Sequence, residues 1–217
     1  MNNIEYTLMR SRRRTLTLTV SGGKVVVKAP YGMPEESILK FISEKRRWLE
    51  AKLAEQKTVA ERFACVRSGV SLLDAGVETP GAYGAAKNGE TDGGFYLKNQ
   101  HAVRAYFEKT RGWLLSECLH SFARSMGVSP SDLSLCDFKA RWGSCDADGR
   151  IKLNWRLTML PPELRDYVLV HELCHLRELN HSAAFWKIVG LYCPAYRTLR
   201  KNLREYSFLT QMYRKSL

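Results

Sequence analysis

Residues 171–181 read His-Glu-Leu-Cys-His-Leu-Arg-Glu-Leu-Asn-His, which is an HExxH motif followed after five residues by a third histidine. On a helix, His171 and His175 are one turn apart and point to the same side, so both imidazoles can reach one metal ion. Glu172 follows the first histidine, where its carboxylate can reach a water on the metal instead of the metal itself. Three nitrogen ligands leave a tetrahedral zinc ion one open position, which separates a catalytic zinc from a structural one.

The residues around the motif favour a metal site over a helix that carries two unrelated surface histidines. Apolar side chains cover most sides of the expected helix: Tyr167, Val168, Leu169, Val170, Leu173, Cys174 and Leu176. Such a helix is usually buried, and the histidines and glutamate inside it need polar partners, which a metal supplies. Cys174, between two expected ligands, is interpreted as a small core residue rather than a catalytic one.

The third ligand has two candidates. A site of this kind can take an acidic residue from a later helix, and the first acid beyond Glu178 is Glu205. His181 is much closer in the chain, and its imidazole suits zinc better. We therefore expect one zinc ion per chain, held by His171, His175 and His181. Asn180 tolerates a left-handed backbone and is expected to make the turn that brings His181 back to the metal.

The composition is that of a globular protein with a large basic excess. The 217 residues are 45% hydrophobic and 26% charged, which suits one domain or two small ones with a real core. The net charge is +12, with basic clusters in residues 10–14, 45–47 and 197–204. This excess favours an anionic partner such as nucleic acid, a nucleotide, an acidic peptide or a ribosomal surface. The alternative is a solvated basic face without a specific partner.

The sequence favours a cytoplasmic protein that does not associate with a membrane. The first residues lack the apolar segment of a secretory signal, and no apolar run is long enough to span a bilayer. The six cysteines are scattered and form no CxxC pair. This pattern is typical of reduced thiols rather than of a disulfide framework or a four-cysteine zinc site.

Residues 1–60 are expected to form a β-hairpin followed by a helix. Residues 15–20 alternate threonine with leucine or valine, Ser21-Gly22-Gly23 offers a turn, and residues 25–29 make the second strand. Pro34 opens a helix. Its apolar stripe consists of Ile38, Phe41, Ile42, Leu49 and Leu53.

Residues 61–98 show little periodicity and are expected to form an irregular linker. Within them, residues 76–94 are rich in Gly, Ala and Thr and predict a long loop.

Residues 99–217 are expected to form the metal-binding catalytic domain. A helix over 99–126 ends at Gly127, and two short strands follow. The second strand, over 151–159, alternates strictly, which predicts one buried face and one face open to water or substrate. Residues 151–158 of this strand are expected to pair with an extended substrate through their backbone. Pro161-Pro162 begins the metal helix, and Ser182 and Pro194 begin two further helices.

Several segments resemble the YgjP-like family of zincin-type metallopeptidases, which are related to SprT-like proteins. They are Arg141-Trp-Gly-Ser-Cys145, Ile151-Lys-Leu-Asn-Trp-Arg156, Tyr167-Val168, His171-Glu-Leu-Cys-His175, Asn180-His-Ser182 and Phe185-Trp186. The resemblance implies an α+β zincin-like fold with a small curved antiparallel or mixed sheet, an HExxH helix, C-terminal helices and an edge strand beside the cleft. It also implies His171, His175 and His181 as ligands and Glu172 as general base.

We therefore expect a zinc-dependent hydrolase that cleaves peptide bonds with a metal-activated water. Zinc polarises the carbonyl, while Glu172 takes the proton of the water and passes it to the leaving amine. A second donor to the carbonyl oxygen is needed, and the candidates, each of which could instead serve packing, are Arg141, Tyr167, Tyr192 and Tyr196.

Two other functions remain open at this point. The same metal could hydrolyse a nucleotide phosphoanhydride, with arginines holding the phosphates, although the sequence has no GxxxxGK[ST] loop. Alternatively, the chain is a zinc-stabilised module that binds nucleic acid or a ribosomal protein without catalysis.

Overall fold

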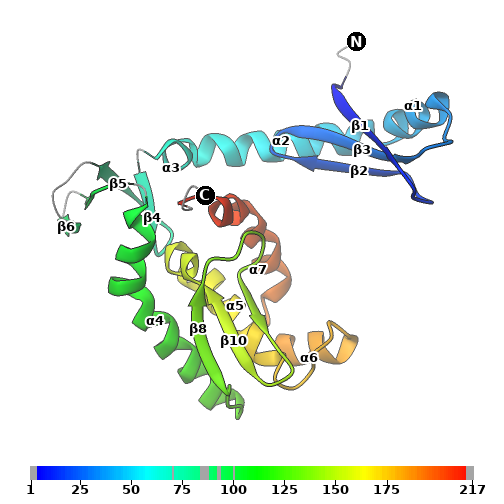
Figure 1. The fold of residues 1–217 in the computed structure, drawn as a ribbon. Coiled ribbons are helices and arrows are strands. Elements are labelled where there is room, and N and C mark those ends of the chain that lie inside the picture. The colour runs from blue at the N-terminus through cyan, green and yellow to red at the C-terminus, as the bar shows by residue number, and fades with distance from the viewer. Residues whose placement is uncertain (1–3, 70, 84–87, 92–93, 100, 214–217) are drawn as a thin grey trace. The chain divides into compact units, whose positions relative to one another are not determined.

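A computed structural model describes residues 4–69, 71–83, 88–91, 94–99 and 101–213. Helices and small sheets are combined in it, which confirms the expected α+β class (Figure 1). The chain divides into two compact units, Met1–Ala64 and Cys65–Leu217, which are treated separately below. The domain boundaries expected near residues 60 and 98 stay predictions.

The first unit contains the expected hairpin and one additional strand. Its three-stranded sheet has the order β1-β3-β2, with β1 (Tyr6–Ser11), β2 (Thr17–Ser21) and β3 (Lys24–Pro30). The β2–β3 pair is antiparallel, whereas β1 runs parallel to β3. The turn requires glycine because Gly22 and Gly23 have φ angles of +58° and +75°.

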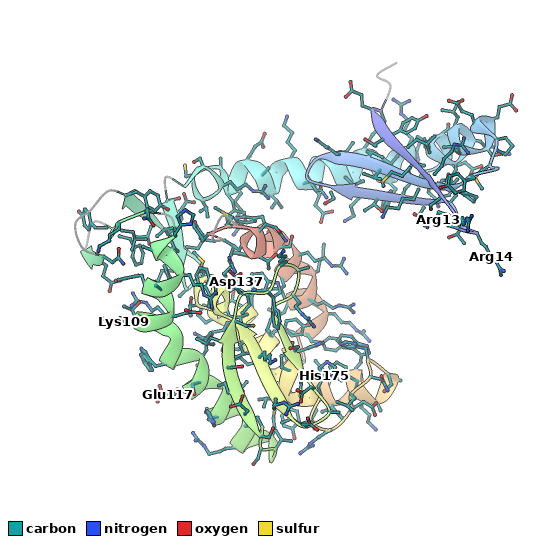
Figure 2. The ribbon with its side chains drawn as sticks, viewed as in Figure 1. Arg13, Arg14, Lys109, Glu117, Asp137 and His175 are labelled. Atoms are coloured by element: carbon teal, nitrogen blue, oxygen red, sulfur yellow. The ribbon has the colours of Figure 1, made fainter. Side chains whose placement is uncertain are left out.

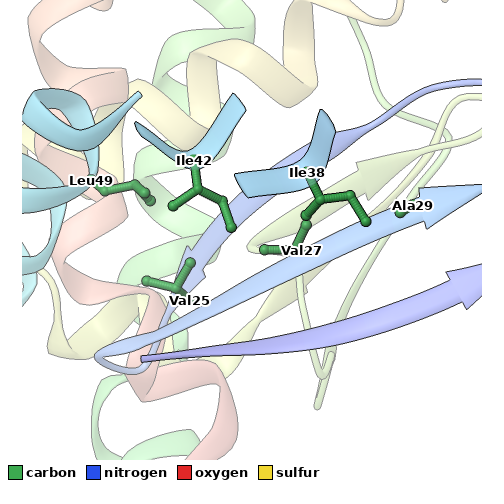
Figure 3. Packing of buried hydrophobic residues seen from close by; sticks show 6 residues of the cluster. All are labelled: Val25, Val27, Ala29, Ile38, Ile42 and Leu49. Atoms are coloured by element: carbon green, nitrogen blue, oxygen red, sulfur yellow. The ribbon is translucent and has the colours of Figure 1, made fainter. Parts of the chain in front are cut away.

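Two helices, α1 (Glu35–Glu44) and α2 (Arg46–Arg62), stand where one was expected. Pro34 precedes the first helix as expected. The core of this unit consists of Val25, Val27, Ala29, Ile38, Ile42 and Leu49 (Figure 3). Gln56 of α2 also fastens the hairpin, since its amide nitrogen donates to Val20 O at 2.8 Å and its oxygen accepts from Gly23 N at 2.8 Å.

In the second unit, short strands occupy much of the segment that we expected to be irregular. They are β4 (Ser71–Asp74), β5 (Val77–Tyr83), β6 (Gly89–Thr91) and β7 (Gly94–Leu97), in the order β4-β5-β7-β6. The expectation of a long loop over 76–94 is therefore wrong for its described residues. The glycines that suggested a loop allow close backbone contact instead: a Cβ on Gly94 would lie 2.4 Å from Pro80 O.

A long helix and a small sheet support the metal helix. Helix α4 (Ala102–Met126) ends as expected at Gly127, whose φ is +62°. The sheet order is β8-β10-β9, with β8 (Asp132–Cys136), β9 (Gly143–Cys145) and β10 (Arg150–Asn154). Strand β10 is central, parallel to β8 and antiparallel to β9.

The strand expected over 151–159 is only half correct. Strand β10 ends at Asn154, and the 3₁₀ helix η1 (Trp155–Met159) follows it. The supposedly open residues Asn154, Arg156 and Thr158 are buried. Asn154 caps η1 by accepting from Arg156 N, and Arg156 donates to Asp137 at 2.6 Å. Internal hydrogen bonds satisfy these polar groups, and β10 has no free edge for a substrate.

The remaining elements carry the candidate site. They are α5 (Pro162–Cys174), α6 (Ala183–Tyr192), α7 (Tyr196–Leu203) and η2 (Arg204–Gln211). Ser182 caps α6 as expected, because its hydroxyl accepts from Phe185 N at 3.2 Å. No helix in the described part of the chain is long and apolar enough to span a bilayer.

The packing of the first unit predicts a large difference between two neighbouring substitutions. Ile38 is fully buried, whereas Leu39 is 48% exposed. Ile38→Ala should lower the free energy of unfolding of this unit by about 2–5 kcal/mol through lost burial and a residual cavity. Leu39→Ala, the matched control, should change it far less. Hydrogen exchange at the amides of β3 measures both effects, and equal losses would contradict the assignment of this core.

Candidate metal centre

The three histidines that the motif singled out meet at the C-terminal end of α5. His171 lies in the last turn of the helix, His175 caps it, and His181 lies just before α6. One nitrogen from each ring lies within 4.8 Å of the others. The Nε2 atoms of His171 and His181 are 3.0 Å apart. Figure 2 shows His175 on the side of the small sheet away from Lys109 and Glu117 of α4.

A compact turn, rather than a left-handed residue, brings His181 back. The backbone nitrogens of Arg177 and Glu178 both donate to Cys174 O, at 3.0 and 3.1 Å. Asn180 does not have a positive φ, so the left-handed turn expected there is wrong. Instead, Asn180 O accepts from Ser182 N at 2.7 Å. Hydrogen bonds to the last carbonyls of α5 therefore make the reversal that a glycine-like residue was expected to make.

The donor set fits a divalent transition metal. His175 Nδ1 lies 3.1 Å from Glu178 O, and because a carbonyl only accepts, this nitrogen carries the proton and leaves Nε2 free as a ligand. Two nitrogens on one tetrahedral zinc lie about 3.3 Å apart, close to the separation of His171 and His181. Glu205, the other candidate third ligand, is not in this cluster.

Aromatic rings pack around the imidazoles of the cluster. Phe185 stacks on His175 at 4.5 Å between centroids, and Trp186 stacks on His181 at 5.7 Å. Burial, together with the charges of the other two histidines and of Arg200, lowers the pKa of His171 to about 3. A neutral ring keeps the lone pair that a metal needs, so binding does not have to displace a proton at neutral pH.

The carboxylate of Glu172 is buried beside strand β9. Burial raises the pKa of this group to about 8, while the charge of Arg141 acts in the opposite direction. The side chain packs directly on Gly143: a Cβ there would lie 2.7 Å from Glu172 Oε1. Gly143 therefore makes room for the carboxylate. This role was not expected from the sequence, although Gly143 belongs to the Arg141–Cys145 segment quoted above.

These groups open into a pocket of about 570 Å³. Its described lining comprises Arg141, Trp142, Gly143, Ser144, Cys145, Tyr167, Val168, His171, Glu172, His175, Leu179, His181, Arg200, Leu203, Arg204 and Ser207. Of the four donors considered for the carbonyl oxygen, Arg141 and Tyr167 belong to this lining and Tyr192 and Tyr196 do not. Arg200 and Arg204 were expected from the sequence only as members of the basic cluster in residues 197–204.

Gly143→Ala should disturb this arrangement. The backbone of Gly143 has no positive φ, and the three heavy atoms nearest to an added Cβ all belong to Glu172. We expect a loss of about 1–3 kcal/mol in the free energy of unfolding, as for other overpacked sites. Gly32→Ala is the matched control, because a Cβ at Gly32 meets nothing within 4 Å. Urea unfolding measures both variants, and an unchanged stability of Gly143→Ala would contradict the contact.

The pKa of Glu172 predicts a pH dependence for the metal-free protein. The pKa in the folded state, about 8, lies above the usual 4.5, so the folded protein retains a proton that the unfolded chain has already released. Stability from this group is complete below pH 4.5 and is lost as the pH rises through about 8. Since one pKa unit corresponds to about 1.4 kcal/mol, the loss amounts to a few kcal/mol.

Glu172→Gln removes this titrating group but leaves His171 in place. The difference in stability between the variant and the natural chain therefore reports on Glu172 alone. The stability advantage of the variant over the natural chain should grow between pH 5 and pH 8 in chelator-treated protein, as measured by urea unfolding at about five pH values. A constant difference across that range would show that Glu172 has an ordinary pKa.

Comparison with known proteins identifies the family of this chain. A family model described as YgjP-like, metallopeptidase domain, matches residues 14–206. Among solved structures, the crystal structure of the metallopeptidase zymogen of Pyrococcus abyssi abylysin shares 21% identity, with a TM-score of 0.39. The match covers 48% of this chain and 99% of that one. No curated protein matches the chain. The family match spans most of the sequence, so the chain belongs to the YgjP-like metallopeptidase domain family.

Proposed function

We propose that this chain is a zinc-dependent metallopeptidase, with His171, His175 and His181 as the ligands of one zinc ion. The observation that carries the proposal is the convergence of three imidazole nitrogens within 4.8 Å of one another. They lie beside the buried carboxylate of Glu172, in a pocket open to a substrate. Imidazole donors suit zinc, and a three-histidine set leaves one position for water or substrate.

Glu172 is proposed as the general base. A bound zinc ion supplies Lewis acidity and lowers the pKa of a water to about 7. Glu172 accepts the proton of the attacking water and delivers it to the leaving nitrogen. The positive charge of Arg141 favours the ionised carboxylate, and a dication at the histidines favours it further. The base role therefore requires the loaded site, since burial alone keeps this carboxyl protonated at neutral pH.

Arg141 and Tyr167 are proposed as donors to the developing negative charge on the carbonyl oxygen. Both line the pocket. Burial raises the pKa of Tyr167 to about 12, so its hydroxyl keeps the proton that it would donate. The guanidinium group of Arg141 offers several N–H donors and no acceptor.

Strand β9 is proposed as the binding edge for an extended peptide. It lies at the edge of the β8-β10-β9 sheet, and all three of its residues, Gly143, Ser144 and Cys145, line the pocket. An edge strand offers backbone groups to which a peptide can add as a further strand. This replaces the substrate strand that the sequence suggested over residues 151–158, because β10 is already paired on both sides.

Substitution of the base should separate catalysis from metal binding. Glu172→Gln should lower peptide hydrolysis by about 100-fold to 10,000-fold, since it removes proton transfer, with about one zinc ion per chain retained. His181→Ala should instead lower the zinc content. Metal analysis by mass spectrometry and turnover of a casein and peptide panel, with and without chelator, measure both. Full activity of Glu172→Gln would rule out the base role.

Hydrolysis of a nucleotide phosphoanhydride is the second candidate, favoured by one observation. Three arginines, Arg141, Arg200 and Arg204, line the pocket, and guanidinium groups bind phosphate well. A panel of nucleotides assayed beside the peptide panel distinguishes the two. Chelator-sensitive turnover of nucleotides without turnover of peptides would replace the peptidase proposal.

A further inference from the structure

The candidate pocket carries an excess of positive charge. Arg141 precedes β9, Arg200 lies on α7, and Arg204 caps that helix one turn later. Glu172 is the only carboxylate among the described lining residues, and its side chain is buried. The open part of the pocket therefore presents guanidinium groups without a matching acid.

These arginines differ from others in the same unit. Arg111 is 3.1 Å from Asp74, and Arg150 is 2.9 Å from Asp146. No ion pair to a described carboxylate is found for Arg141, Arg200 or Arg204. Unpaired guanidinium groups around a pocket are available to an anionic ligand.

Aromatic rings hold two of the guanidinium groups in place. Arg141 lies over the ring of Phe138 at 4.4 Å, and Arg200 lies over that of Trp186 at 4.8 Å. Trp186 also stacks on His181, a proposed metal ligand, at 5.7 Å between centroids. Stacking fixes the plane of a guanidinium and leaves its edge donors free. The ring of Trp186 therefore contacts both the guanidinium of Arg200 and the imidazole of His181.

We propose that the pocket selects peptides that carry an aspartate or glutamate side chain beside the scissile bond, with Arg200 and Arg204 as its carboxylate ligands. This rests on the proposed peptidase function. Arg200 and Arg204 are one turn apart and project from the same side of their helix, a spacing that suits one carboxylate. The β9 edge at the same pocket supplies the backbone partners that a peptide needs and a nucleotide does not.

A binding experiment tests the proposal independently of turnover. Zinc-loaded Glu172→Gln protein is titrated into two fluorescent peptides that differ only by Asp or Asn next to the central bond, and anisotropy is recorded. We expect about tenfold tighter binding of the aspartate peptide, as one charge-assisted contact provides. Adding Arg200→Gln and Arg204→Gln should reduce this preference to nearly one, while Arg200→Lys should preserve part of it.

Arg197→Gln is the matched control. Arg197 lies on the same helix and stacks on Tyr196, but it is not among the lining residues, so the preference should be unchanged although the protein loses the same charge. If Arg197→Gln and Arg200→Gln weaken the preference equally, or if the two peptides bind equally to the parent protein, the proposal is overturned. Circular dichroism identifies any variant that does not fold, in which case Arg204→Gln alone decides.

The experiment also separates this proposal from the peptidase function. Cleavage of neutral and acidic peptides at equal rates by the natural chain would leave the function standing and reject the acidic preference. An acidic preference in binding without any cleavage would support the acidic preference and reject the peptidase function. Stronger competition by a nucleoside triphosphate than by the aspartate peptide would assign the arginines to phosphate and overturn the proposal.

Discussion

The geometry of the candidate site depends on how the chain leaves α5. The helix ends at Cys174, and the carbonyl of that residue accepts two backbone hydrogen bonds from the following turn. The same turn places the carbonyl of Glu178 against His175 Nδ1. One short reversal thus returns His181 to the helix and also orients the ring of His175. Ligand position and ligand tautomer follow from the same few backbone contacts.

Buried polar residues hold the loop and strand β9 on the side of the site that faces Glu172. The alternating sequence pattern had predicted that these polar residues are exposed to solvent. Asn154 donates to the carbonyls of Phe138 and Arg141, each at 3.1 Å. Arg156, fully buried, pairs with Asp137 and donates to Met212 O near the C-terminus. These contacts fix the loop that leads into β9, and β9 in turn carries the glycine on which Glu172 packs. The buried charge of Arg156 is tolerated because its guanidinium donates hydrogen bonds to the Asp137 carboxylate and to a backbone carbonyl.

The features that could be predicted from the sequence are those that depend on residues close to one another in the chain. The three histidines, the hairpin turn at Gly22 and Gly23, and the cap at Ser182 each depend on neighbours in the chain, so spacing and residue type were sufficient. Burial of Arg156 depends on a carbonyl 56 residues later, which no local pattern reveals. The strands within 71–97 were hidden for a related reason: their glycines serve close backbone contacts, and glycine alone also indicates a loop.

The net charge of +12 likewise has no single meaning, because arginines of different clusters have different partners. In the first unit, Arg10 Nη1 lies within hydrogen-bonding distance of the carbonyls of Pro30, Tyr31 and Met33, so this residue of the 10–14 cluster stabilises the end of a strand. Arg200 instead stacks on an aromatic ring beside the histidines. An arginine that donates its N–H groups to carbonyls of its own chain has few donors left for a partner. An arginine that stacks on an aromatic ring keeps its N–H donors free. Binding of an anionic partner therefore depends on the arginines that have no carboxylate partner within the described part of the chain. In the second unit these include the arginines that line the pocket beside Glu172.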